Sequence, residues 1–254
     1  MSRIAEIGFI EASARSLIGE RARNEDAWFA LDADRGAPPG HGLFAVADGM
    51  GGHAAGDLAS RIAVETLSEI FVPASRLDRP SESRLEAAFE RAHERILERG
   101  LRDPAASGMG TTLTAAWIGG GRCAFAHIGD SRLYRFRKGV LALLTTDHNL
   151  AARMRFEGHY PAEEYERGPL RHALYAYVGR DPLTVQLGSV EAAPGDVFVL
   201  ATDGFVAPLA HETLASWLAA DREHADLAGH LADRVSRRKL KDNATVVAAR
   251  VMGA

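Results

Sequence analysis

The sequence is poor in cysteine and holds no long apolar run. Cys123 is its only cysteine, so an intrachain disulfide and a thiolate metal cluster are both excluded. No stretch approaches the ~18 consecutive apolar residues that a membrane-spanning helix needs, and the N-terminus lacks the basic-then-apolar pattern of a signal peptide. We therefore expect a protein of the reducing cytoplasm, with Cys123 as a small core residue.

A strong excess of charge of either sign is also lacking. Thirty basic and 34 acidic residues give a formal net charge of −4, which provides no general attraction to nucleic acid or to an anionic membrane. The one dense basic run, at residues 234–241, is explained as a solvated helix end whose cations interact favourably with the helix dipole. With 254 residues and 46% apolar content, the chain is long enough to bury a substantial core.

The apolar patterns alternate between strand and helix blocks without an internal repeat. Strands are predicted at 4–14, 27–33, 43–47, 111–118, 122–128, 132–136, 185–190, 196–201 and 244–251. Helices are predicted in two pairs, at 56–71 with 83–99 and at 212–220 with 224–238. Strands and helices grouped in this way indicate an α+β fold with packed sheets covered by helices. No linker divides the sequence, so we expect one domain over residues 1–254.

Acidic residues stand beside glycine or at predicted strand ends in four short stretches. These are Asn24-Glu25-Asp26, Ala47-Asp48-Gly49, Thr202-Asp203-Gly204 and Lys241-Asp242-Asn243. Asp48 and Asp203 each end an apolar run, where an unpaired charge at the edge of the core would be costly and a cation would compensate it. A single Asp-Gly pair is more often an ordinary turn. Four such stretches together favour a site for hard divalent cations.

Seven short motifs follow one another along nearly the whole chain. They are Gly19-x-Arg21-x-x-Asn24-Glu25-Asp26, Ala47-Asp48-Gly49-Met50-Gly51-Gly52-His53, Gly110-Thr111-Thr112-Leu113, His127-Ile128-Gly129-Asp130-Ser131-Arg132, Thr146-Asp147-His148, Ala201-Thr202-Asp203-Gly204 and Asp242-Asn243-Ala244-Thr245-Val246-Val247. In this order they resemble the metal-dependent serine/threonine protein phosphatases of the phosphatase 2C type, and most closely the bacterial members. The resemblance implies a central sandwich of two antiparallel β-sheets flanked by pairs of α-helices, with a two-metal site at one edge.

The resemblance also implies a set of metal ligands. The set consists of Glu25, Asp26, Asp48, Gly49, Asp130, Asp203 and Asp242. Asp48 would bridge two Mn²⁺ or Mg²⁺ ions, helped by the carbonyl group of Gly49. Asp203 and Asp242 would bind one of the two ions. Oxygen ligands of this kind suit both Mn²⁺ and Mg²⁺, so the choice between them stays open.

The remaining acids of the set have more indirect implied roles. Glu25 and Asp26 would serve the other ion, directly or through water. Asp130 would take part in a third, weaker metal site that shares Asp203, or alternatively would cap the turn that follows it. Many relatives carry another acid where this chain has Ala207, so a third ion would have one ligand fewer.

The implied activity is hydrolysis of phosphoserine and phosphothreonine in proteins by a water that bridges the two metals. A phosphate monoester is dianionic and repels hydroxide, so catalysis needs cations that activate a water, align it and offset the phosphoryl charge. Arg21 is the candidate for binding the phosphoryl oxygens, because a guanidinium is a planar fork of donors. A surface salt bridge is the alternative role of Arg21. Arg21 and Asp48 are therefore the catalytic candidates.

Three histidines lie within the motifs. His53 stands next to a predicted helix start, which favours helix capping or an indirect contact over a role as general acid. His127 and His148 are expected to form structural hydrogen bonds. None of the three is assigned to a metal.

Residues 149–180 form a loop-rich insert at the place where the family carries a mobile flap beside the active site. Gly158, Pro161, Gly168 and Pro169 separate two short helical stretches, as the hinges of a lid would. A static surface loop is the alternative. We expect substrate choice to depend on this insert.

Together these observations predict a cytoplasmic phosphoprotein phosphatase that consists of the catalytic domain and opposes a serine/threonine kinase in signalling. Its expected partners are phosphorylated proteins, including such a kinase or its substrates. Two alternatives stay open, a two-metal phosphoesterase acting on a small metabolite and a catalytically silent regulator that binds phosphoproteins. The presence of Arg21 and the acids argues against the silent regulator, since silent members usually lose metal ligands.

Overall fold

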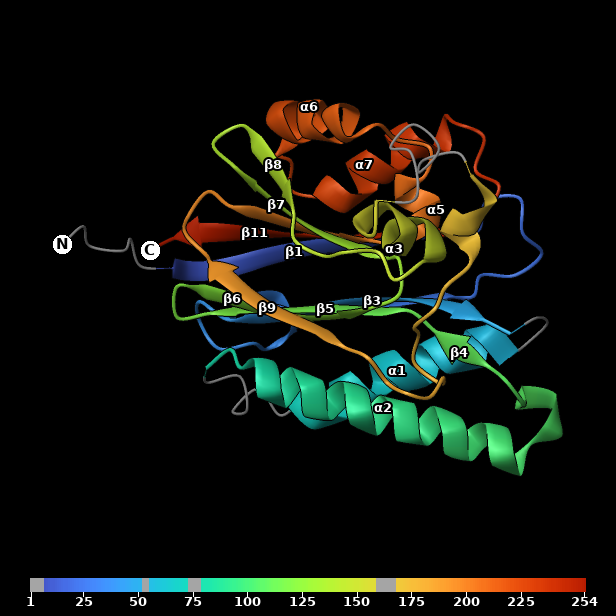
Figure 1. Cartoon of the computed structure of the whole chain (residues 1–254). Coiled ribbons are helices and arrows are strands. Elements are labelled where there is room, and N and C mark those ends of the chain that lie inside the picture. The colour runs from blue at the N-terminus through green and yellow to red at the C-terminus, as the bar shows by residue number, and fades with distance from the viewer. Residues whose placement is uncertain (1–6, 52–54, 73–78, 159–167) are drawn as a thin grey trace.

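The computed structural model describes residues 7–51, 55–72, 79–158 and 168–254, to which every structural statement below refers. Two antiparallel sheets are stacked face to face, and helices cover the outer face of each sheet (Figure 1). The predicted fold class, an α+β sandwich of two antiparallel β-sheets flanked by pairs of α-helices, is therefore confirmed. None of the helices within the described ranges has the length and apolar character needed to cross a membrane.

One sheet combines strands from both ends of the sequence. Its order is β1 (Ile7–Leu17), β11 (Ala244–Gly253), β10 (Val197–Ala201), β7 (Arg132–Arg137) and β8 (Val140–Leu143). The first and last strands are neighbours along almost their whole length, from Ile7 opposite Gly253 to Leu17 opposite Ala244. This pairing places the segment after β1 beside the segment before β11.

The other sheet is built from the middle of the sequence. Its order is β2 (Asp26–Leu31), β3 (Gly42–Met50), β5 (Leu113–Gly119), β6 (Arg122–Ile128) and β9 (Gln186–Glu191). The short strand β4 (Gly110–Thr111) pairs with the end of β3. The pairing of β4 brings Thr111 opposite Gly49, next to the predicted acidic site.

The strand β3 shows how the core is divided into layers. Leu43, Ala45 and Ala47 belong to the cluster that packs against helices, whereas Phe44 and Val46 belong to the cluster between the two sheets. All five side chains are fully buried. Successive side chains of a strand point to opposite faces, so a strand covered on both faces needs a continuous apolar run. The continuous apolar run at 43–47 is therefore explained by burial of β3 on both faces.

Each helix pair covers one sheet. The helices α1 (Ala55–Phe71) and α2 (Glu82–Arg102) pack on the sheet that contains β3, and α6 (His211–Asp221) and α7 (Leu227–Ser236) pack on the sheet that contains β10 (Figure 1). Ser81 caps α2 by accepting a hydrogen bond from the Arg84 amide at 3.4 Å, and Asp226 caps α7 by accepting one from the Gly229 amide at 2.9 Å. One helix of each pair therefore begins at a side-chain cap, and both pairs pack on their sheets through apolar side chains.

The structure differs from the prediction mainly at the ends of elements. The first strand runs to Leu17 rather than to residue 14, because β11 pairs with it over that length, and residues 4–6 lie outside the described residues. The second strand ends at Leu31, where Asp32 caps a short 3-10 helix, Ala33–Arg35. Three short elements, β4, β8 and the helix α5 (Asp203–Val206), are not predicted. Elements of two to four residues are too short to show a hydrophobic period.

Substitution of Phe198 tests how much the apolar layer between the two sheets contributes to stability. Its side chain is fully buried in the same cluster as Phe44 and Val247. We expect Phe198→Ala to lower the free energy of unfolding by about 3–5 kcal/mol, because it removes a large side chain and leaves a cavity. Urea unfolding followed by circular dichroism measures this change.

Leu101 provides the matched control for that measurement, because its side chain is 87% exposed. Leu101→Ala should change the free energy of unfolding by less than about 0.5 kcal/mol. Equal unfolding midpoints for the two variants would contradict the placement of Phe198 in the core.

Candidate active site

The predicted acids meet at one end of the sandwich. Asp26 begins β2 and Asp48 lies near the end of β3, and the two residues are direct partners in the β2–β3 pairing. Asp203 follows β10 and Asp242 precedes β11, which is the antiparallel neighbour of β10. Antiparallel neighbours place the end of one strand beside the start of the next. Asp130 lies in the turn between β6 and β7.

A cavity of about 430 Å³ opens among these residues. It is lined by all of the predicted site residues except Asp26, namely Arg21, Glu25, Asp48, Gly49, Asp130, Asp203 and Asp242. The structure thus brings together side chains that are as much as 221 positions apart, as in the contact between Arg21 and Asp242. Sequence reasoning assigned no role to the seven further lining residues, which are Met50, Gly51, Thr112, His172, Leu174, Tyr177 and Asn243.

Glycine is required at two of the motif positions by close backbone contacts. A Cβ atom at Gly49 would lie 2.0 Å from the carbonyl oxygen of Gly56 in α1. A Cβ atom at Gly204 would lie 1.9 Å from the carbonyl oxygen of Asn243. These distances are far below van der Waals contact, so only glycine lets the backbone approach so closely. The glycines therefore set the positions of the neighbouring Asp48 and Asp203.

Asn243 holds the loop that carries Arg21 and Glu25. Its Oδ1 atom accepts a hydrogen bond from the Glu25 amide at 2.9 Å. Its Nδ2 atom donates to the carbonyl oxygens of Ile18 at 2.8 Å and Arg23 at 2.9 Å. One side-chain amide thus satisfies three backbone groups across the loop. This explains why the motif at the start of β11 contains asparagine directly after Asp242.

Thr112 ties Asp48 to the turn that contains Asp130. Its hydroxyl accepts a hydrogen bond from the Asp48 amide at 2.9 Å and forms another with the hydroxyl of Ser131, also at 2.9 Å. The Thr112 amide donates to the Asp48 carbonyl oxygen at 2.9 Å. The end of β3 that carries Asp48 and the turn that carries Asp130 are therefore held relative to one another through Thr112.

Asp26 lies behind the cavity rather than on its surface. Its Oδ2 atom accepts hydrogen bonds from the hydroxyls of Thr202 at 2.9 Å and Thr245 at 2.6 Å. Its Oδ1 atom is buried and has no hydrogen-bond partner among the described protein groups. Burial raises the pKa of Asp26 to about 7, and the nearby charges of Asp203 and Asp242 also raise it. A buried, unpartnered carboxylate oxygen is a group that an ordered water or a cation would satisfy.

Burial and mutual repulsion also raise the pKa values of the acids at the cavity. For Asp48 the largest cause is burial, followed by the charges of Asp26, Asp203, Asp130 and Asp242. Burial is likewise the largest cause for Asp130 and for Asp203. The surroundings at this end of the sandwich thus disfavour the charged form of several carboxylates relative to its stability in water. A divalent cation would reverse that preference by supplying opposite charge.

The carboxylates are not arranged around a common point. Within the described ranges, no three histidine, cysteine, aspartate or glutamate side chains converge closely enough to hold a metal ion in their present conformations. Asp242 instead pairs with Arg21, with 2.6 Å between Oδ2 and Nη2, and this contact raises the pKa of the Arg21 guanidinium. The salt bridge considered as the alternative role of Arg21 is therefore present. Its partner is one of the predicted metal ligands.

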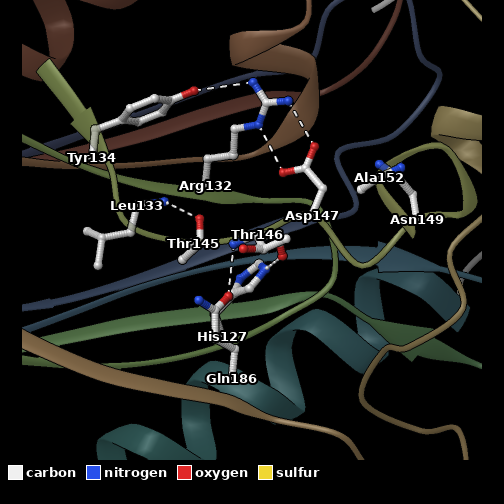
Figure 2. Close-up of polar contacts among 10 residues, drawn as sticks. All are labelled: His127, Arg132, Leu133, Tyr134, Thr145, Thr146, Asp147, Asn149, Ala152 and Gln186. Atoms are coloured by element: carbon white, nitrogen blue, oxygen red, sulfur yellow. Dashed lines mark hydrogen bonds and ion pairs between the residues drawn. The ribbon is translucent and has the colours of Figure 1, made fainter. Parts of the chain in front are cut away.

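The three motif histidines have different outcomes. His53 lies outside the described residues. His127 is buried and forms a hydrogen bond with the Thr114 hydroxyl at 2.8 Å. It forms another with the Thr146 carbonyl oxygen at 3.1 Å (Figure 2). Burial lowers the pKa of His127 to about 3, so this residue is neutral and structural. The prediction of structural hydrogen bonds is confirmed for His127, and His148 likewise accepts one from the Gly129 amide.

The insert at 149–180 contributes side chains to the cavity. The described part contains the helix α3 (Leu150–Phe156) and a 3-10 helix, Pro169–His172, while residues 159–167, including Pro161, lie outside the described residues. His172 and Tyr177 line the cavity. The charge of Arg171 opposes the rise in the pKa of Asp203. Sequence reasoning placed the insert beside the site but did not identify these residues, since no motif marks them.

Two antiparallel sheets with a carboxylate-lined cavity at one end define the class of protein, an α+β protein with an acidic site. The sequence profile described as Protein phosphatase 2C matches residues 15–243, so the chain belongs to the protein phosphatase 2C family. The family predicted from the order of the motifs is confirmed.

Similar proteins agree with this assignment. The chain is 35% identical over 243 residues to the serine/threonine protein phosphatase PstP of Mycobacterium tuberculosis, a match that covers 94% of this chain and 44% of PstP. It is 30% identical over 240 residues to the protein phosphatase PhpP of Streptococcus pneumoniae, covering 93% and 96% of the two chains. It thus spans less than half the length of PstP.

A solved structure shows the same similarity in three dimensions. The crystal structure of the catalytic domain of PstP in complex with two manganese ions is similar with a TM-score of 0.82 and 33% sequence identity. The match covers 96% of this chain and 99% of that one. The similarity extends over both sheets and the helices that flank them.

The raised pKa of Asp26 predicts how stability depends on pH. The pKa is about 7 in the folded protein and about 4 in an unfolded chain. Between these values the folded protein binds a proton that the unfolded chain has lost, so the free energy of unfolding falls as pH rises. We expect the melting temperature of the metal-stripped protein to fall by several degrees between about pH 5 and about pH 8.

Asp26→Asn provides the comparison for this prediction. The variant keeps an oxygen that accepts the hydrogen bonds of Thr202 and Thr245 but cannot ionise. Its melting temperature should fall less over the same pH range, in differential scanning fluorimetry with a chelator present. An unchanged pH dependence in the variant would contradict the assignment of the shift to Asp26.

Proposed function

We propose that this chain is a metal-dependent phosphoprotein phosphatase that hydrolyses phosphoserine and phosphothreonine. The observation that carries the proposal is the single cavity in which Arg21 and carboxylates from distant segments meet. The similarity to PstP and PhpP, both named as protein phosphatases, supports the reaction class. The two manganese ions in the PstP catalytic domain support the metal dependence.

The proposed ligands of two Mn²⁺ or Mg²⁺ ions are Asp48, Gly49, Asp203, Asp242 and Glu25. They offer carboxylate oxygens and one backbone carbonyl, and hard cations of this kind prefer such oxygen donors. When bound, the two cations lower the pKa of a water and offset negative charge on the phosphoryl group. The mutual repulsion that raises the pKa of Asp48 supports this set, since cations remove the repulsion.

Asp26 and Asp130 have supporting roles in the proposal. The hydroxyls of Thr202 and Thr245 fix one oxygen of Asp26, so its other oxygen is the acceptor for a water at the site. Asp130 shares the cavity with Asp203 and would contribute to a third, weaker metal site. Ala207 supplies no carboxylate to such a site.

Arg21 is proposed to bind the phosphoryl oxygens of the substrate. Its present partner is Asp242, and more than half of the Arg21 side chain is exposed. An exposed ion pair contributes little to stability, so it is easily exchanged. A cation bound at Asp242 would compete with Arg21 for the carboxylate and would leave the guanidinium to the dianionic phosphate.

We further propose that the described chain acts as one catalytic domain in the cytoplasm, where it opposes a serine/threonine kinase. Residues 149–180 would act as a flap that contributes to substrate choice. His172 and Tyr177 support this role, because they reach the cavity from the insert. The buried free thiol of Cys123 is in keeping with a reducing compartment.

Metal dependence is the first test of this function. Purified, metal-stripped protein should release no phosphate from a phosphothreonine peptide, and titration with Mn²⁺ should restore the release. Asp203→Ala should remain at the level of the metal-stripped protein, because it removes a proposed ligand. Absence of release from the folded wild-type protein at every Mn²⁺ or Mg²⁺ concentration would contradict the proposal.

The substrate class is tested with the same protein. Small phosphate esters of metabolites, assayed in parallel, should be poorer substrates than phosphopeptides, as judged by kcat/KM. A clear preference for a small ester would favour the alternative of a metabolite phosphoesterase. Tight binding of phosphoprotein without turnover would favour the silent regulator.

The role of Arg21 is tested by substitution. We expect Arg21→Ala to lower kcat/KM for a phosphopeptide by roughly 100-fold, because the phosphoryl group loses a charged donor. Arg21→Lys should recover only part of that loss, since lysine keeps the charge but not the planar fork. Steady-state kinetics at saturating Mn²⁺ separates this effect from metal binding. Wild-type kcat/KM in Arg21→Ala would show that the residue serves only the salt bridge.

A further inference from the structure

The motif at 146–148 does not line the cavity of the proposed metal ligands, although the segment that contains it is buried. Residues 145–149 connect β8 to α3 and belong to neither sheet. Asp147, His148 and Asn149 are nevertheless at most 7% exposed. Burial of an irregular polar segment requires that its polar groups find partners.

Asp147 fixes this segment to the strand β7. Its two carboxylate oxygens accept hydrogen bonds from Arg132 in a two-pronged ion pair, with Nε–Oδ1 at 3.0 Å and Nη2–Oδ2 at 2.8 Å (Figure 2). The Thr145 hydroxyl accepts another hydrogen bond from the Leu133 amide at 3.1 Å. Arg132 begins β7 and is only two residues from Asp130. The segment is thus attached where the chain leaves the Asp130 turn.

His148 holds that turn directly. Its amide donates a hydrogen bond to the Gly129 carbonyl oxygen at 2.6 Å, and its Nδ1 atom accepts one from the Gly129 amide at 3.3 Å. Gly129 has a φ angle of 112°, a conformation that favours glycine. Both backbone groups of the residue before Asp130 are therefore bound by a single histidine.

The same histidine also holds the insert. The Tyr175 amide donates to the His148 carbonyl oxygen at 3.0 Å, and the rings of the two residues lie 5.6 Å apart. Next to this contact, the Leu150 amide donates to the Ala173 carbonyl oxygen at 2.9 Å. Leu174, between these two anchor points, lines the cavity.

We propose that Asp147 and His148 are positioning residues, which join the Asp130 turn and residues 173–175 of the insert into one unit fixed to β7. Neither residue lines the cavity of about 430 Å³, and Asp147 lines a smaller cavity together with Asp130 and Asp203. Both residues act by positioning groups that line the larger cavity. The catalytic meaning of this unit rests on the proposed phosphatase function. The hydrogen bonds that hold this unit together are a property of the folded chain and can be measured without turnover.

The chain contains a matched control for a merely structural ion pair. Arg137, on the same strand β7, forms a two-pronged pair with the buried Asp196, in which Nη2–Oδ2 measures 2.6 Å. Asp196 lies in the segment before β10 and does not line the cavity. Asp147→Asn and Asp196→Asn both leave a half-buried arginine of β7 without its full partner. Only the first should affect the site.

Amide hydrogen exchange of the metal-stripped protein is the direct test. Asp147→Asn should cause the Leu150 and Tyr175 amides to lose protection, whereas Asp196→Asn should leave both as protected as in the wild type. Normal protection in a folded Asp147→Asn variant would overturn the proposal. Equal loss in both variants would also overturn it, because general destabilisation would then explain the effect.

Kinetics tests the consequence for the site. Asp147→Asn should raise the Mn²⁺ concentration for half-maximal phosphopeptide hydrolysis by about 10-fold, as outer residues that orient a metal site commonly do. Asp196→Asn should need the wild-type concentration. Equal Mn²⁺ requirements would contradict a positioning role. Absence of turnover in the wild type would contradict the proposed function. The exchange experiment would still decide whether Asp147 and His148 hold the turn and the insert together.

A second variant covers the case in which Asp147→Asn does not fold. The double variant Arg132→Met with Asp147→Leu removes both charges and leaves apolar side chains, a replacement that buried ion pairs often tolerate. It should fold and should still lose protection at Leu150 and Tyr175. A folded double variant with wild-type protection would overturn the proposal.

Discussion

Repulsion among partly or fully buried carboxylates is the constraint on which the rest of the site depends. Burial is the largest cause of the raised pKa values of Asp26, Asp48, Asp130 and Asp203, and the charges of neighbouring acids, Asp242 among them, raise these pKa values further. Such a cluster opposes folding unless hydrogen bonds, protons or cations compensate it. The fold supplies the hydrogen bonds through threonine and asparagine side chains placed at strand ends. Bound divalent cations would supply the charge, which is why metal dependence and the architecture of this end of the sandwich belong together.

Much of the fold and of the site could be predicted from the sequence, because burial in the core determines both the pattern of apolar residues and the position of the strands. Leu43 to Ala47 are apolar without interruption since both faces of β3 are covered, and Asp48 follows where the strand, which ends at Met50, reaches the cavity. The position of Asp26 behind the cavity, its bonds to Thr202 and Thr245, and the pairing of Arg21 with Asp242 could not be predicted. These contacts join segments far apart in sequence, and no local pattern encodes them.

The polar residues at this end of the molecule form a continuous support around the acids. Asn243 carries the loop of Arg21 and Glu25, Thr112 connects Asp48 to the Asp130 turn, and His148 connects that turn to the insert. Each residue bonds backbone groups as well as side chains, so the acids are held by the fold rather than by long flexible contacts. The site therefore combines a fixed set of carboxylates with an insert whose position is linked to one of them.

The most direct test of the central claim is a crystal structure of the protein soaked with Mn²⁺ and measured for anomalous scattering. The account predicts two manganese peaks in the cavity, each with carboxylate oxygens at about 2 Å, and Asp48 in contact with both. Asp242 should then contact manganese instead of Arg21. A cavity without manganese peaks, or peaks bound only by residues other than Asp48, Asp203 and Asp242, would contradict the account.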